Sequence, residues 1–243
     1  MHRKRTLIGM LTPSSNTALE PITSMMLAGL PDASAHFGRF RVTQIALNDS
    51  ALKQFDDSNI LAAAELLADA ELHAIAWNGT SSSWLGFDTD EKLCQRITER
   101  TGIPAGTSVL AINEILKATG ARDIAFVTPY TDDVQERIDA NYARAGFNVV
   151  AERHLGLSHN FSFSEVSDEE IIAMVRAVAQ ARPHAIIPLC TNLKAAPLVE
   201  QLEREIGIPI YDSISTAVWK CLKLAAVDPR RVAGWGRLFR EVA

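Results

Sequence analysis

Cys190 is the side chain in this sequence best placed to do chemistry. It directly follows an apolar run, residues 185–189, that is typical of a strand, and Thr191 comes after it. A free thiol titrates near ~8.5, and helix N-termini and nearby donors lower that value, so we expect a lowered pKa suited to proton transfer. Cys94 and Cys221 lie inside helical patterns and are predicted to be small core residues.

Small hydroxyl and amide residues gather in four segments, each between a predicted strand and a predicted helix. The segments are residues 13–17, 78–83, 128–131 and 189–192. A helix N-terminus offers unpaired N–H groups and a favourable dipole to an anion. Helix capping explains one or two of these residues in each segment. The unbroken run of hydroxyl residues from Thr80 to Ser83 exceeds that need and favours a binding site for a carboxylate.

The elements that must position these segments alternate between strand and helix. The apolar runs typical of buried parallel strands are residues 6–11, 73–77, 124–127 and 185–189. The segments whose apolar residues recur every three and four positions, as in helices packed on a sheet, are residues 60–70, 109–118, 133–145 and 168–181. Such alternation predicts an α/β fold with doubly wound parallel sheets.

Three landmarks of the first half recur in the second half in the same order. The matched pairs are residues 10–13 with 126–129, 74–80 with 185–191, and 102–108 with 207–213. General strand-turn-helix grammar would also produce some similarity of this kind. The repeat predicts two similar half-domains related by a pseudo-twofold axis, residues 1–116 with 215–243 and residues 117–214. The carboxyl ends of their strands would face one another, and ligands bind in that crevice in α/β proteins.

Composition narrows the range of partners and cofactors. The formal net charge of the 243 residues is −5 and the basic residues form no stripe, so nucleic acid is not expected. No apolar run approaches the ~18 to 20 residues of a membrane helix. Three cysteines, an odd number, indicate reduced thiols in the cytoplasm. A homo-oligomer would be ordinary for a soluble enzyme.

No cofactor and no metal are expected. The sequence contains neither a glycine-rich dinucleotide motif nor a P-loop. Its six histidines do not show metal-ligand spacing with one another or with the cysteines. His154 and His159 are lone histidines in predicted loops, and we expect them to be solvated rather than ligands.

The double half-domain and the strand-end pair Cys190-Thr191 resemble the aspartate/glutamate racemase superfamily. In that superfamily two cysteines, one from each half, face opposite sides of the substrate α-carbon. Residues 13–17 and Asn160 are similar to the maleate cis-trans isomerases. The segments that resemble the arylmalonate decarboxylases are residues 79–81, 130–134 with 136–137, 154–156 and 236–239. The resemblance covers nearly the whole chain.

The chain departs from the racemases and maleate isomerases at Gly79, where those enzymes have the first-half cysteine. Cys190 alone remains, which is the pattern of the arylmalonate decarboxylases. One thiol can protonate only one face of a planar enediolate, so racemisation by two opposed thiols is not expected. The absent thiol also weakens the comparison with maleate isomerases, in which the first-half cysteine is the expected nucleophile.

The resemblance to the decarboxylases implies roles for individual residues. Thr80, Ser81 and Tyr130 would donate to the carboxylate that stays, and backbone N–H groups after Pro13 and Cys190 would complete a dioxyanion hole. Cys190 would protonate the carbanion. The apolar candidates to surround the departing carboxylate are Trp77, Trp84, Phe161 and Phe163. The predicted substrate-binding residues are Pro13, Ser14, Asn16, Gly79, Thr80, Ser81, Tyr130, Asn160 and Thr191.

Three functions fit these features. The first is a cofactor-free decarboxylase of a malonate-like dicarboxylate, with Cys190 as the catalytic acid. The second is a maleate-type isomerase, because Asn16 and Asn160 suggest a polar substrate with a second carboxylate. The third is a carboxylate-binding relative without catalysis, in which loss of the first-half thiol ended the chemistry. Tyr130 could also be a core aromatic at a helix start rather than a ligand.

Overall fold

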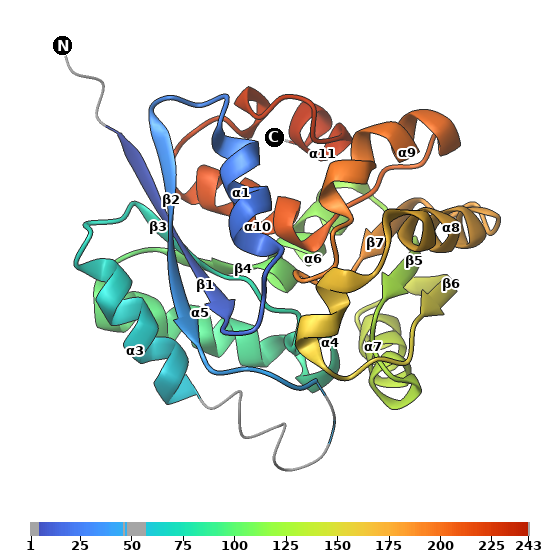
Figure 1. Ribbon diagram of the computed structural model, residues 1–243, viewed down its shortest axis with the longest axis horizontal. Helices are drawn as coiled ribbons and strands as arrows, with labels where there is room; N and C mark the ends of the chain where they lie inside the picture. Colours follow the sequence, from blue (N-terminus) through green and yellow to red (C-terminus); the bar gives the residue numbers. More distant parts are fainter. Residues whose placement is uncertain (1–4, 46, 48–56, 243) are drawn as a thin grey trace.

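The computed structural model describes residues 5–45, 47 and 57–242, and they form an α/β molecule with two parallel sheets. The first sheet has the order β2-β1-β3-β4, and the second has the order β6-β5-β7. The strands are β1 (Thr6–Pro13), β2 (Ala33–Phe40), β3 (Ala74–Trp77), β4 (Ala105–Thr107), β5 (Asp123–Thr128), β6 (Asn148–His154) and β7 (Ala185–Pro188). Figure 1 shows the two sheets beside each other with helices around them. The predicted doubly wound α/β fold is confirmed.

The two sheets repeat one topology. In each sheet the first strand along the chain lies between the second and the third, and all pairs are parallel. In the first sheet β4 pairs with β3, and in the second the corresponding contact is a parallel bridge from Ile186 to Ile210. Gly102 and Gly207 both end helices in the left-handed conformation shortly before these pairings. The predicted two similar halves are therefore present.

The helices cover the sheets and start close to the strand ends. They are α1 (Leu19–Leu27), α3 (Asp57–Ala68), α4 (Ser82–Leu85), α5 (Phe87–Thr101), α6 (Ser108–Thr119), α7 (Asp132–Arg144), α8 (Asp168–Ala179), α9 (Val199–Ile206), α10 (Ser213–Leu224) and α11 (Arg237–Glu241), with 3₁₀ turns η2 (Asn160–Glu165), η3 (Ala196–Leu198) and η4 (Pro229–Arg231). Helix α10 packs on α6, β3 and β4, so the chain returns to the first sheet after completing the second. The predicted boundaries near residues 117 and 214 stay a prediction.

Burial explains which strands the sequence predicts. Strands β3 and β7 are buried along their whole length, so their sequences are continuous runs of apolar residues. Strands β2 and β6 lie at sheet edges and are mostly half-buried, and neither their composition nor an alternating pattern marks them. Sequence analysis accordingly missed β2 and β6, and it also missed the three-residue edge strand β4.

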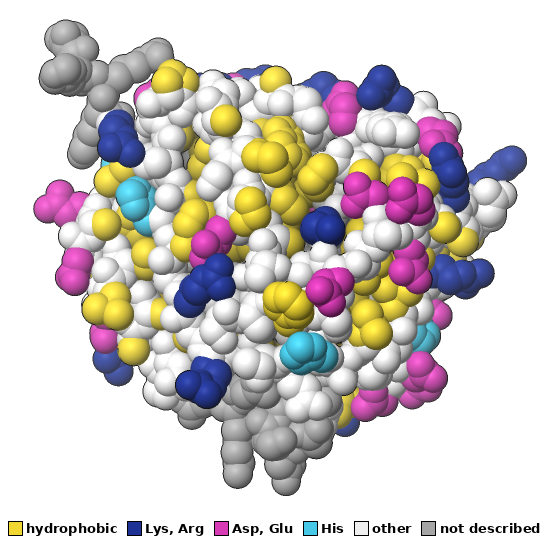
Figure 2. Space-filling model, in the orientation of Figure 1, with side chains coloured by type: hydrophobic (Ala, Val, Ile, Leu, Met, Phe, Trp, Pro, Cys, Tyr) yellow, Lys and Arg dark blue, Asp and Glu magenta, His cyan; other side chains and the backbone are white. Residues whose placement is uncertain are grey.

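The described surface carries mixed charge. Figure 2 shows basic and acidic side chains interspersed over one face of the molecule. Within the described residues, no helix combines the length and the apolar character that crossing a membrane requires.

His154 links the end of β6 to the start of α7. Its Nδ1 lies 2.7 Å from Glu152 Oε2, and its Nε2 lies 2.9 Å from Asp132 Oδ1. The bond to Glu152, followed in importance by the bond to Asp132, raises the pKa of His154 above its ordinary value of 6.5. The protonated imidazolium, which can donate from both nitrogens, is therefore favoured in the folded protein.

We expect His154→Gln to destabilise the protein most under mildly acidic conditions. Because the folded-state pKa is raised, the contribution of His154 is present below its unfolded value and is lost as pH rises through the folded value. Urea unfolding at about pH 6 and about pH 8.5 measures the difference between variant and wild type. Glu152→Gln is the control and should flatten the same pH dependence. A deficit of equal size at both pH values would contradict the assignment.

Candidate active site

The strand-end segments of the two halves meet at the carboxyl ends of the central strands. Thr80 Oγ1, after β3, lies 2.6 Å from the Tyr130 hydroxyl, after β5. Thr191, after β7, donates its hydroxyl to the carbonyl of Asn78 at 2.9 Å. The structure therefore brings the predicted first-half and second-half residues into direct contact.

Cys190 lies two residues beyond β7 and is only 3% exposed. Its sulfur accepts the backbone N–H of Asn192 at 3.4 Å. Burial raises the pKa of the Cys190 thiol to about 11, although hydrogen bonds from Tyr130 and Asn192 lower it. The expectation of a lowered pKa is wrong, because desolvation of the thiolate outweighs these donors. The thiol is thus protonated at neutral pH and suited to act as an acid.

Tyr130 connects the thiol to the first half. Burial, and then the charge of Cys190, raise the pKa of Tyr130 well above its ordinary value, so its hydroxyl stays a donor. The ring is held edge-on by Trp84, at 5.2 Å between centroids, and by Phe163, at 5.7 Å. Tyr130 is therefore a packed core aromatic whose hydroxyl reaches the candidate site. The two roles predicted for it, core aromatic and hydrogen-bond donor to a substrate, are compatible.

The predicted apolar residues divide into two groups. Trp77, Trp84 and Phe163 are buried around the strand ends. Phe161 is 42% exposed, on the outer side of η2, so it is a poor candidate for a buried wall. Its neighbour Phe163 faces inward instead, because the two residues are separated by two positions of a tight 3₁₀ turn.

Asn192, which sequence analysis did not single out, forms a clamp between the halves. Its Oδ1 accepts the N–H groups of Thr17 at 3.0 Å and Ala18 at 3.2 Å, just before α1. Its Nδ2 donates to the carbonyl of Asn160 at 2.6 Å. The available signal was an amide residue directly after Cys190-Thr191, and only the fold shows what it reaches.

Asn16 belongs to the same clamp. Its Nδ2 donates to the Thr191 carbonyl at 3.0 Å, and its Oδ1 accepts the N–H groups of Ala18 and Leu19. Both ends of this amide are therefore engaged within the protein. The predicted contact of Asn16 with substrate stays a prediction.

The remaining predicted residues border the clamp. Asn160 donates to Ser15 Oγ at 2.7 Å, while the Ser14 hydroxyl accepts the N–H of Val42. Pro13 ends β1. Gly79 and Ser81 flank Thr80, and the Ser81 carbonyl accepts the N–H groups of Trp84 and Leu85 in α4. Direct binding of substrate by these residues stays a prediction.

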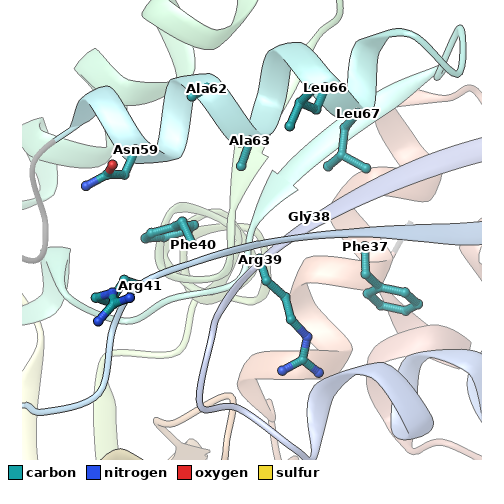
Figure 3. A pocket seen from close by; sticks show the side chains of 10 residues that line it. All are labelled: Phe37, Gly38, Arg39, Phe40, Arg41, Asn59, Ala62, Ala63, Leu66 and Leu67. Atoms are coloured by element: carbon teal, nitrogen blue, oxygen red, sulfur yellow. The ribbon is translucent and has the colours of Figure 1, made fainter.

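Cavities occur both beside the site and away from it. A cavity of about 190 Å³ is bordered by Trp77 and Ser81 together with α3 and α5 residues. Another, of about 490 Å³, lies between β2 and α3 and is bordered by residues that include Arg39 and Leu66 (Figure 3). None of the predicted substrate-binding residues borders the cavity of Figure 3, so we do not assign it to the site.

The histidines lie apart from Cys190 in their contacts. His154 is engaged by Glu152 and Asp132, and His159 lies beside Phe161, with ring centroids 6.2 Å apart and ring planes tilted by 45°. Within residues 5–45, 47 and 57–242, no group of three or more His, Cys, Asp or Glu side chains is arranged to hold a metal ion.

Comparison with known proteins agrees with this geometry. The family model described as arylmalonate decarboxylase matches residues 8–239. Arylmalonate decarboxylase of Bordetella bronchiseptica is 26% identical, covering 96% of each chain. Maleate isomerase of Nocardia farcinica is also 26% identical, covering 96% of this chain and 95% of that protein.

The similarity extends to three-dimensional structure. The solved structure of Nocardia farcinica maleate cis-trans isomerase bound to TRIS has a TM-score of 0.87 at 25% identity, covering 97% of this chain and 98% of that chain. Decarboxylase and isomerase relatives are equally similar in sequence, so the comparisons identify the branch and not the reaction. With its family model spanning almost the whole length, this chain belongs to the arylmalonate decarboxylase family, a group of enzymes within the aspartate/glutamate racemase superfamily.

Proposed function

We propose that the protein decarboxylates a malonate-like dicarboxylate without a cofactor, with Cys190 as the single catalytic acid. The observation that carries the proposal is the asymmetry between the halves. Cys190 follows β7, whereas Gly79 occupies the matching place after β3. Cys94 and Cys221 belong to α5 and α10, and Cys221 is fully buried in the core.

The hydroxyl donors support binding of the carboxylate that stays on the substrate. Thr80 and Tyr130 hydroxyls lie 2.6 Å apart and share one hydrogen bond, so both can donate to a bound carboxylate once that bond is exchanged for bonds to the substrate. The high pKa of Tyr130 keeps its proton available. When carbon dioxide leaves, negative charge spreads onto that carboxylate as an enediolate. Preorganised donors aimed at developing charge typically contribute about 3 kcal/mol each to lowering a barrier.

Cys190 then completes the reaction. Its S–H proton passes to the α-carbon of the enediolate, forming the C–H bond of the monocarboxylate product and leaving a thiolate. Water returns a proton to the sulfur before the next turnover. With a pKa of about 11, Cys190 rests as a thiol, and the thiolate left after proton transfer is basic enough to be reprotonated quickly. These properties suit a proton donor better than a nucleophile, which would have to rest as a thiolate.

A second candidate is a maleate-type isomerase, and Asn16 with Asn160 favours it. Both amides are buried at the junction of the halves, close to Thr191 and Ser15. A second substrate carboxylate would have to replace bonds that these amides make within the protein, such as those from Asn16 to Thr191 and from Asn160 to Ser15. We rank this candidate below decarboxylation because Gly79 occupies the place of the first-half cysteine, which is the nucleophile expected to add to the double bond.

We expect Cys190→Ala to lower decarboxylation by about 10²- to 10⁴-fold, the usual contribution of a positioned acid. The measurement is carbon dioxide release and deuterium incorporation from α-aryl malonates in heavy water, followed by NMR. Cys94→Ala is the matched control and should keep wild-type turnover, since Cys94 lies in α5. Full activity of Cys190→Ala would end the proposal. Conversion of maleate to fumarate without carbon dioxide release would select the isomerase instead.

We expect the reactivity of Cys190 towards iodoacetamide to keep rising with pH up to about 11. An ordinary thiol would level off above its pKa of ~8.5, whereas the pKa of Cys190 is raised to about 11 by burial. The variant Cys94→Ala/Cys221→Ala isolates this thiol for mass-spectrometric labelling. If labelling reached a plateau below about pH 9, the thiol would not be the protonated acid that the mechanism requires.

A further inference from the structure

Trp77 occupies the space in which a first-half thiol would lie. A Cβ built on Gly79 would come within 1.9 Å of Trp77 Cζ2 and 2.3 Å of Trp77 Cε2. Real Cβ atoms essentially never approach other atoms below 3.0 Å. Any side chain at position 79 therefore requires the indole to move.

The indole is not a loose side chain. Trp77 is the last residue of β3, which pairs with a strand on each side, and it is 1% exposed. Its ring packs on Phe40 with 5.0 Å between centroids. Trp77 also borders the cavity of about 190 Å³, and moving the ring away from Gly79 would disturb its contact with Phe40.

The second half gives an internal comparison. In the repeat, Trp77-Asn78-Gly79-Thr80 aligns with Pro188-Leu189-Cys190-Thr191. Pro188, the last residue of β7, is compact and leaves room for a side chain two positions later. In the second half, the residue two positions before this place is the compact Pro188, and the place carries the thiol of Cys190. In the first half, the residue two positions before it is Trp77, and the place carries no side chain.

We propose that Trp77 is a specificity-determining residue: its indole fills the space that a side chain at position 79 would need, and so keeps a second thiol out of the first half. This inference rests on the proposed decarboxylation. With the second position filled, the enediolate receives its proton from Cys190 alone, and a chiral monocarboxylate product forms as one enantiomer. The product also stays unracemised, because position 79 carries no thiolate that could remove its α-proton from the other face.

The steric claim is tested without any assay of activity. We expect Gly79→Ala to lower the melting temperature by about 5 °C in the wild type, the size of shift that overpacking produces in a chain of this length. In a Trp77→Leu background the same substitution should shift it by no more than about 1 °C. Equal shifts in the two backgrounds would overturn the claim, since the indole would then not be the obstacle.

The stereochemical claim uses Gly79→Cys with and without Trp77→Leu. The probe is an α-aryl-α-methyl malonate, and the readouts are product enantiomeric excess and deuterium exchange at the α-carbon of the isolated enantiomer. We expect Gly79→Cys alone to exchange slowly, and Trp77→Leu/Gly79→Cys to exchange at least about tenfold faster, as expected for a positioned proton-transfer group. Equal exchange by both variants would overturn the inference.

The outcomes separate this inference from the proposed function. If the wild type releases no carbon dioxide from any malonate, the proposed function fails, while the melting-temperature cycle still decides whether Trp77 excludes a side chain at position 79. If Trp77→Leu folds and Gly79→Cys folds in neither background, the indole is not what excludes the thiol and the inference fails. If Gly79→Cys folds only alongside Trp77→Leu, the inference is supported.

Discussion

The side-chain amide of Asn192 joins segments that lie far apart in the chain, and the geometry of the site depends on it. It accepts two N–H groups before α1, 175 and 174 positions away, and donates to the carbonyl of the first residue of η2. Asn16 and Thr191 add bonds across the same junction. A buried amide that lacked these partners would be costly, so the network specifies one arrangement of the two halves. Cys190, two residues before Asn192, lies at this junction beside the hydroxyl of Tyr130.

The environment of Cys190 shows why burial and polarity must be considered together. The thiol is enclosed, yet a tyrosine hydroxyl and a backbone N–H point at its sulfur. Enclosure makes the thiolate costly and keeps the proton on sulfur, while these donors moderate that cost for the short time in which a thiolate exists. In the same enclosed, low-dielectric environment, hydrogen-bond donors stabilise negative charge that develops on a substrate more strongly than they would in water. In the proposed decarboxylation, the acid and the donors to the carboxylate would both benefit from this one dry environment.

The repeat in the sequence predicted the two sheets, their parallel order and the meeting of the strand ends, because buried central strands and helix-ending glycines leave local signals. The edge strand β2 left none, since its half-buried residues need no regular pattern. The direction of the Cys190 pKa shift depends on how many atoms from distant segments enclose the sulfur, and flanking residues do not record this. The approach of the Trp77 ring to Gly79 depends likewise on packing against Phe40. Asn192 was visible in the sequence, but its partners were not.

The return of the chain to the first sheet has an entropic consequence. Because α10 packs on α6, β3 and β4, the second sheet is connected to the first through both of its ends. The two halves therefore meet as parts of one molecule at a high effective concentration, and the loss of translational freedom that separate subunits would suffer does not arise. Because the two halves are covalently connected, a few amide contacts are enough to hold their junction. Residues around the candidate site can then change during evolution without separating the halves.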